Sequence, residues 1–172
     1  PDYKWADVAS HLGRIFGLEK FSLATRLPTD LEAIKAAIAK EIQPHRNVAN
    51  FRIKVSRADK AFPAKSKDIE IALGAFVQEL TNLPVNLKQA ELTITLEIVP
   101  EEAYLYFDHT PGLGGLPPGV SGKLVCLMSG GIDSPVAAFR MMKRGAQVVF
   151  VHFHAFPLLW GLSRDKVEAM LH

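Results

Sequence analysis

The residues best suited to chemistry form one short stretch of this 172-residue chain, residues 129–135, with the sequence SGGIDSP. Its adjacent glycines let the backbone approach a ligand with no Cβ in the way. Asp133 or Ser134 can cap a helix that starts here, and Pro135 suits the first helical position. A helix start offers unpaired N–H groups at the positive end of the helix dipole, where phosphate binds well. The stretch therefore suits a phosphate-binding turn, although it lacks the Lys-Ser/Thr pair of a Walker A loop. Taken as single residues, these positions favour a second interpretation, an ordinary capped turn between a strand and a helix of any parallel sheet.

Two continuous apolar runs flank this turn and predict the strands that position it. Residues 123–128 and 148–153 are short and uninterrupted, as in strands buried on both faces of a parallel sheet. A helix over residues 136–144, stopped by Gly145, would connect them. The result is a βαβ unit with a glycine turn between its first strand and its helix.

The preceding part of the chain alternates helix and strand patterns. Thr29 with Glu32 three residues later forms a capping box that starts a helix, and Pro44 ends that helix. The spacing of apolar residues then predicts a strand at 50–56, a loop at 57–66, a helix at 67–81 and strands at 92–98 and 103–107. This α-β-α-β-β order is enough for one compact α/β domain.

Two further segments lie outside that block. Residues 5–16 predict a helix and residues 21–25 a short strand, and these elements together are too little for a domain. Residues 109–122 contain five Gly and three Pro, a composition that predicts a linker.

Charge is concentrated in one segment, although the chain as a whole carries only +2. Residues 46–67 hold seven cations against Asp59 alone. Such a segment is a candidate anion-binding site. The solvent faces of a strand and a loop would give the same pattern, and charge alone favours that second interpretation.

Other features exclude several classes of protein. Apolar residues make up 48% and charged residues 22%, which is ordinary for a globular protein and unlike a disordered one. The single cysteine, Cys126, excludes an internal disulfide framework, and its apolar surroundings favour structural burial over catalysis. His152 and His154 have no Cys or acidic partner nearby in the sequence, so we expect no metal site there. No apolar run approaches the ~18 residues of a membrane span.

The string SGGIDS after a buried strand resembles the PP-loop of ATP pyrophosphatases, which cleave ATP between its α and β phosphates and leave AMP on an acceptor. The resemblance implies that the pyrophosphate portion of ATP is held by Ser129, Gly130, Gly131, Asp133 and Ser134. Asp133 is the expected catalytic residue and would help to hold Mg²⁺. Ligands of such sheets lie beyond the strand C-termini, so the adenosine side would be lined by Leu127, Met128, His152 and Phe153.

The flanking sequence narrows the resemblance. Residues 112–157 look like the tRNA 4-thiouridine synthetases, the tRNA sulfurtransferases that are also linked to thiamine thiazole synthesis. Residues 29–110 resemble a THUMP RNA-binding domain, and residues 1–28 the end of a ferredoxin-like domain. The expected α/β chain is thus a THUMP-like domain, a linker at 111–122 and, at 123–172, the first βαβ unit of a PP-loop parallel sheet.

That family uses ATP to adenylate a uridine carbonyl oxygen in tRNA, after which a persulfide sulfur displaces AMP. The resemblance implies ATP and Mg²⁺ as cofactors, tRNA as partner, and a cysteine desulfurase or sulfur carrier as persulfide donor. It also implies a cytoplasmic protein without membrane contact and permits a homodimer. Phosphates of tRNA would be neutralised by Arg52, Lys54, Arg57, Lys60, Lys65 and Lys67. Phe62 beside them suits either base stacking or a core position.

The sequence stops at His172, inside an expected helix over 163–171 and before the further parallel strands that a PP-loop domain needs. We therefore expect this chain alone not to thiolate tRNA, and to associate through an unfinished sheet edge. Two alternatives stay open. One is an RNA-binding THUMP module with an inert PP-loop remnant, and the other is a different PP-loop ATP pyrophosphatase.

Overall fold

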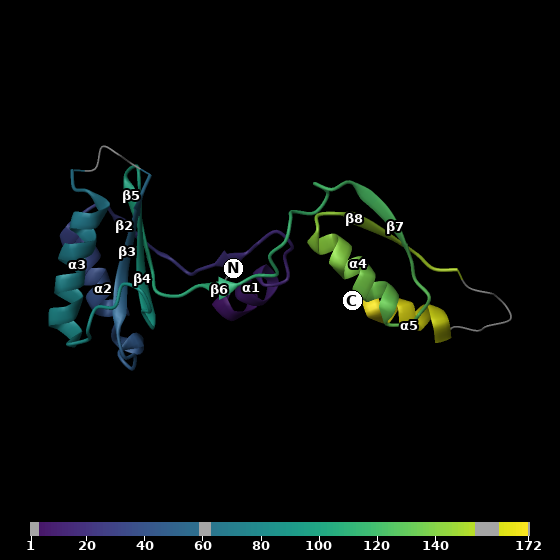
Figure 1. The fold of residues 1–172 in the computed structure, drawn as a ribbon, viewed down its shortest axis with the longest axis horizontal. Coiled ribbons are helices and arrows are strands. Elements are labelled where there is room, and N and C mark those ends of the chain that lie inside the picture. Colours follow the sequence, from purple (N-terminus) through teal and green to yellow (C-terminus); the bar gives the residue numbers. More distant parts are fainter. Residues whose placement is uncertain (1–3, 59–62, 154–161, 172) are drawn as a thin grey trace. The chain divides into compact units, whose positions relative to one another are not determined.

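The computed structural model describes residues 4–58, 63–153 and 162–171. The chain divides into two compact units (Figure 1). One unit is Ser22–His109, and the other combines Pro1–Phe21 with Thr110–His172.

The unit Ser22–His109 is a four-stranded sheet with two helices on one face (Figure 1). Its strands are β2 (Thr25–Pro28), β3 (Phe51–Arg57), β4 (Leu92–Val99) and β5 (Glu102–Tyr106), in the order β2-β5-β4-β3. Only β3 and β4 are parallel, and α3 (Ser66–Thr81) connects them. The other helix, α2 (Leu31–Glu41), is followed by the short 3-10 helix η1 (Gln43–His45).

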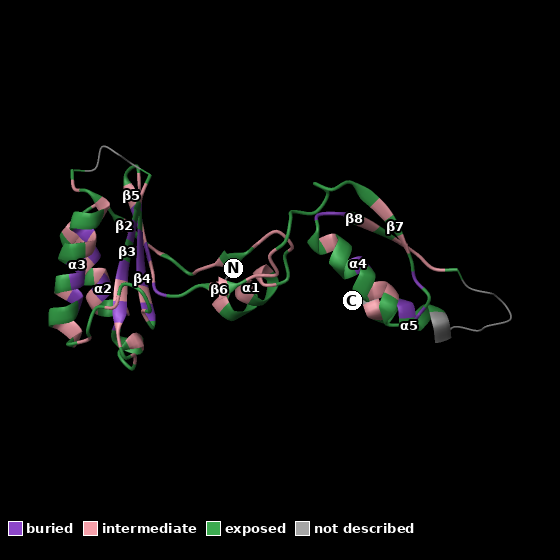
Figure 2. Ribbon diagram, viewed as in Figure 1, coloured by how far each residue is buried: buried purple, intermediate pink, exposed green. Residues whose placement is uncertain are grey.

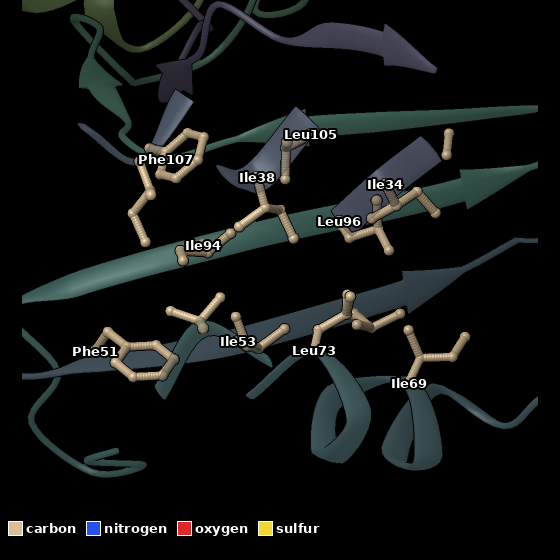
Figure 3. Packing of buried hydrophobic residues seen from close by; sticks show 14 of the residues in the cluster. Ile34, Ile38, Phe51, Ile53, Ile69, Leu73, Ile94, Leu96, Leu105 and Phe107 are labelled. Atoms are coloured by element: carbon tan, nitrogen blue, oxygen red, sulfur yellow. The ribbon is translucent and has the colours of Figure 1, made fainter. Parts of the chain in front are cut away.

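Period-two alternation in the strands places the core between this sheet and its helices. Phe51, Ile53 and Val55 of β3 are buried, as are Leu92, Ile94, Leu96 and Ile98 of β4. Ile34 and Ile38 of α2 and Leu73 of α3 meet them with no exposed surface (Figures 2 and 3). The residues between the core positions of each strand lie on the opposite face, which none of the described helices covers.

Three details of this unit differ from the sequence predictions. The helix α2 is capped by Asp30, whose carboxylate accepts from the Ala33 N–H at 2.8 Å, so the capping residue is not Thr29. The single strand predicted at 21–25 is two strands in different units, because Lys20–Phe21 (β1) pairs with Thr110–Pro111 (β6) while β2 pairs with β5. This pairing places residues 25–28 in the four-stranded sheet, whereas the predicted domain division fell after residue 28.

The second unit contains the predicted βαβ arrangement. Strands β7 (Lys123–Leu127) and β8 (Gln147–Val151) are parallel, and α4 (Asp133–Lys143) connects them. The unit also contains α1 (Trp5–Leu12) and α5 (Leu162–Leu171). The predicted helix 5–16 is shorter, because α1 ends at Leu12 with Gly13 as its C-cap.

Burial in the βαβ unit differs from the expectation of strands covered on both faces. Val125, Leu127 and Val149 are 61%, 60% and 50% exposed (Figure 2). On the other face, the Cys126 thiol lies 3.6 Å from the Ser134 carbonyl oxygen of α4. Within the described residues, helices therefore cover only one face of this two-stranded sheet.

Residues 116–122 are hydrogen-bonded to the βαβ unit, whereas the Gly112 and Gly114 N–H groups donate to the carbonyls of Glu19 and Leu18. The Leu116 N–H donates to the Lys143 carbonyl at 2.9 Å, and the Gly119 and Ser121 N–H groups donate to the Gly145 carbonyl. Gly115 has a φ of +84°, and a Cβ there would lie 2.2 Å from the Lys143 carbonyl oxygen. The glycine content of this segment thus permits a close backbone contact with the end of α4.

Candidate functional site

The predicted phosphate-binding turn joins the end of β7 to the start of α4. Gly130 adopts a φ of +80°, a backbone conformation that strongly favours glycine. Ser129, Gly131 and Asp133 are exposed, and the Gly131 N–H lies 3.4 Å from the Ser129 hydroxyl oxygen. The turn is therefore open to solvent at these three residues, whereas Gly130 is buried, and it leads directly into a helix, as the sequence predicts.

The start of α4 is arranged differently from the prediction. The helix begins at Asp133, so Pro135 is its third residue and not its first. Its N-cap is Ile132, which supplies no side-chain hydrogen bond, so neither Asp133 nor Ser134 acts as the cap. A helix start without a side-chain cap leaves its N–H groups available to an anion.

Ser134 has an unusual environment at this helix start. Its hydroxyl oxygen is buried and finds no hydrogen-bond partner among the residues that the structure describes. A buried hydroxyl left without a partner costs about 1–3 kcal/mol. Rotation of the side chain toward the turn would give this hydroxyl an anionic acceptor, so its position fits a phosphate ligand.

The four residues predicted for the adenosine side lie together at the carboxyl ends of β7 and β8. The Met128 N–H donates to the Val151 carbonyl at 2.8 Å, and Leu127 pairs with Val151. The Leu127 and Phe153 side chains are 60% and 79% exposed, whereas Met128 is buried. His152 Nδ1 lies 2.6 Å from the Met128 carbonyl oxygen.

The described part of the chain contains no group of three or more side chains that could hold a metal ion. His152 belongs to the strand end described above, and His154 lies outside the described residues. Mg²⁺ commonly takes one or two protein carboxylates and completes its shell with phosphates and water. The exposed Asp133 carboxylate fits that requirement at the edge of the turn.

The basic residues predicted to bind RNA are divided between two places in the unit Ser22–His109. Arg52 and Lys54 belong to the helix-free face of the sheet, where Arg52 Nε donates to Thr93 Oγ1 at 2.9 Å. Lys65 and Lys67 are exposed at the start of α3. Arg57 donates from Nη1 to the Ala64 carbonyl at 2.6 Å and so supports the start of α3. Lys60 and Phe62 lie outside the described residues.

The helix-free face also carries aromatic residues that the sequence analysis did not single out. Tyr104 lies between Arg26 and Glu97 in the sheet register, and Tyr106 lies opposite Thr95. Strand alternation at 103–107 was the available signal, because it places both tyrosines on the face opposite Ala103 and Leu105. The face therefore combines aromatic rings with the cations of Arg26, Arg52 and Lys54.

The pKa of each phenol is raised above its ordinary value. The Tyr104 hydroxyl donates to Glu102 at 2.6 Å, and this bond raises the pKa of Tyr104. The Tyr106 hydroxyl donates to Glu97 at 2.7 Å. Burial, with a further contribution from this hydrogen bond, raises the pKa of Tyr106 to about 12. Neither ring therefore carries charge near neutral pH.

Comparisons with known proteins agree with both units. A family model described as "THUMP domain" matches residues 28–108, and one described as "Thiamine biosynthesis protein (ThiI)" matches residues 119–172. A "Probable tRNA sulfurtransferase" of Thermus thermophilus is 51% identical over 170 residues, which cover 99% of this chain and 42% of the relative. The chain thus spans about two fifths of the length of the curated relatives that it matches.

Solved structures of similar fold also cover nearly the whole of this chain. A 4-thiouridine synthetase in complex with RNA and bound ATP has a TM-score of 0.82 and 30% identity, with 99% of this chain and 45% of that chain covered. PH1313 from Pyrococcus horikoshii has a TM-score of 0.85 and 28% identity, with 96% and 54% covered.

The fold and the matches define a chain in which a THUMP domain is joined to an α/β unit with a glycine turn at the end of a parallel strand. The chain is similar to the tRNA sulfurtransferases, with a THUMP match over residues 28–108 and a ThiI match over residues 119–172. These matches agree with the resemblance and the fold class that the sequence predicts from SGGIDSP and from the alternating helix and strand patterns before it.

None of the described helices is both long and apolar enough to cross a membrane.

Proposed function

We propose that this protein is an ATP-dependent tRNA sulfurtransferase that converts a tRNA uridine to 4-thiouridine. The observation that carries the proposal is the exposed glycine turn at the carboxyl end of β7, which leads into a helix start without a side-chain cap. The solved relative with RNA and bound ATP supports both ligands. In this chain the turn between β7 and α4 supplies the nucleotide contacts, and the unit Ser22–His109 supplies the RNA contacts.

The reaction follows from what the turn can bind. The uridine carbonyl oxygen attacks the α-phosphorus of ATP, and pyrophosphate leaves with the electrons of the broken P–O bond. Backbone N–H groups of Gly130 and Gly131, with the hydroxyls of Ser129 and Ser134, would stabilise the pyrophosphate portion. The terminal sulfur of a donor persulfide then attacks the uridine carbon and expels AMP, which leaves with the electrons of the broken C–O bond. A second thiol attacks the donor sulfur of the resulting C–S–S link, so that the donor becomes a disulfide and the electrons of the broken S–S bond form the C=S of 4-thiouridine. AMP is a far better leaving group than the oxide that direct substitution would release.

Asp133 has a separate role in this proposal. Its carboxylate lies at the start of α4 beside the turn, where it would hold Mg²⁺ against the phosphates. Mg²⁺ neutralises charge that develops on the phosphate oxygens. Leu127, Met128 and Phe153 would bound the adenosine side.

The proposed RNA contacts use both groups of cations. Arg52 and Lys54 of the helix-free face, and Lys65 and Lys67 at the start of α3, would neutralise phosphates. Arg57 would hold that helix start in place through the Ala64 carbonyl. Tyr104 and Tyr106 offer uncharged rings on which unpaired bases could stack.

The same proposal includes a cysteine desulfurase or sulfur carrier as persulfide donor, a homodimeric assembly and a cytoplasmic location, where tRNA and ATP occur together.

The test is tRNA thiolation by the complete gene product with Asp133→Asn, which keeps the shape of the side chain and removes its charge. We expect ATP-dependent 4-thiouridine formation to fall at least about tenfold, as for the loss of one charged contact to the reacting phosphates. Asp165→Asn is the matched control, because Asp165 is an exposed carboxylate in the first turn of α5. Equal activity of the Asp133→Asn protein and the control would contradict the role of Asp133.

A further inference from the structure

We infer that His152 is a positioning residue for the phosphate-binding turn and acts through the peptide bond between Met128 and Ser129. The inference rests on the proposed function, since it concerns how the same nucleotide is held. It differs from the sequence prediction, in which His152 lines the adenosine side.

The geometry lies where the pairing of β7 with β8 ends. The Met128 N–H donates to the Val151 carbonyl at 2.8 Å. The Met128 carbonyl oxygen lies 2.6 Å from His152 Nδ1. A carbonyl oxygen can only accept, so Nδ1 is the ring nitrogen that carries the hydrogen. Backbone and imidazole thus hold both polar groups of Met128, one residue before the turn.

A held carbonyl fixes the direction of the next N–H group. The peptide bond is planar and trans, so the Met128 carbonyl and the Ser129 N–H point in opposite directions within one rigid plane. Ser129 is the first residue of the turn, and its N–H is one of the donors offered to phosphate. The imidazole therefore sets the orientation of the first donor without touching the ligand.

The two glycines that follow give the held peptide bond between Met128 and Ser129 a function. Gly130 and Gly131 follow at once, and glycine loses more backbone freedom on ordering than any other residue. Met128 is 3% exposed, so its side chain is also held in place. A fixed peptide before a flexible pair reduces the number of conformations that phosphate binding must select from.

This role and a direct adenosine contact predict different losses. Removing a positioning residue weakens the binding of the phosphates and leaves the binding of adenosine unchanged. Removing an adenosine contact weakens the binding of adenosine and leaves the binding of pyrophosphate unchanged. Inorganic pyrophosphate and adenosine are therefore the two probes that separate them, with ATP as the complete ligand.

The experiment measures the affinity of the complete gene product for ATP, pyrophosphate and adenosine, each with Mg²⁺, for wild type, His152→Leu and His152→Asn. Leucine removes the donor. Asparagine places its amide nitrogen near the position of Nδ1 and keeps the donor. We expect the His152→Leu substitution to lower the affinities for ATP and pyrophosphate about tenfold, which is the effect of losing one hydrogen bond. The affinity for adenosine should be unchanged. We expect His152→Asn to restore affinity to within about threefold of wild type.

Three outcomes would overturn the inference. They are unchanged pyrophosphate affinity in the His152→Leu protein, a loss of adenosine affinity as large as the loss for ATP, and no rescue by His152→Asn. If His152→Leu fails to fold by circular dichroism, His152→Gln takes its place, because its amide nitrogen lies nearer the Nε2 position. Failure of the wild-type protein to bind ATP or pyrophosphate would instead refute the proposed function, which distinguishes the two failures.

Discussion

The two units of the chain bury their apolar residues to different extents. In the unit Ser22–His109, Ile34, Ile38 and Leu73 have no exposed surface. In the βαβ unit, Val125 and Leu127 of β7 are 61% and 60% exposed, although their sequence is equally apolar. The difference teaches that strand alternation defines one buried face, whereas a continuous apolar strand depends on two covering layers.

The same contrast separates the two proposed roles. The first unit holds its aromatic and basic residues on a sheet whose core is complete, which gives them a rigid support. The second unit holds the nucleotide turn at the end of two paired strands, where a few hydrogen bonds determine its geometry. Substitutions should therefore affect stability in the first unit and ligand affinity at the turn of the second.

The largest effect is expected from Leu73→Ala, which removes a fully buried side chain from the core against the sheet. We expect the free energy of unfolding to fall by about 2–5 kcal/mol. Val149→Ala, at a position that is 50% exposed, should cost under about 1 kcal/mol. Urea unfolding followed by circular dichroism measures both. Equal losses in the free energy of unfolding for the two variants would contradict the expected difference in packing between the units.

A second prediction concerns pH and the helix-free face. The pKa of Tyr106 is raised to about 12 in the folded protein, against about 10 in an unfolded chain. The protonated phenol therefore contributes stability that is complete below pH ~10 and is lost as the pH rises toward ~12. Unfolding measured across this range should show a steeper decline for wild type than for Tyr106→Phe. Parallel declines would mean that the phenol does not titrate differently on folding.

The smallest effect is expected from Lys54→Gln on the helix-free face. Loss of one phosphate contact should weaken tRNA binding modestly and reduce the slope of log affinity against log salt by about 1. The control is Lys40→Gln, because Lys40 is exposed in the last turn of α2. ATP affinity should be unchanged in both. A slope equal to that of wild type would exclude Lys54 from the RNA contacts.

Local patterns predicted much of this molecule. Alternation at 50–56 and 92–98 gave β3 and β4, because one buried face leaves a period-two signal. The turn between a strand and a helix at 129–135 was also predictable, since adjacent glycines follow a continuous apolar run and precede a helical pattern. The predicted start of α4 was late by three residues, because Pro135 is tolerated within the first turn as well as at its first position.

The remaining errors depended on contacts between distant residues. Thr29 and Asp30 are both good capping residues, and the extended backbone of Asp30, with φ −113° and ψ 129°, decided between them. The glycines of 112–122 predict a linker by composition. Their role follows only from contacts such as that between Gly115 and the Lys143 carbonyl. Tyr104 and Tyr106 needed the sheet order β2-β5-β4-β3 before they could be placed on the same face as Arg26 and Lys54.

The most direct measurement is the change in backbone amide NMR signals when inorganic pyrophosphate and Mg²⁺ are added to the complete gene product. We predict the largest shifts at Ser129, Gly130, Gly131 and Ser134, with little change across β3, β4 and β5. Shifts confined to the basic residues of the unit Ser22–His109, or no shift at the turn with saturating pyrophosphate, would contradict a phosphate-binding role for residues 129–135.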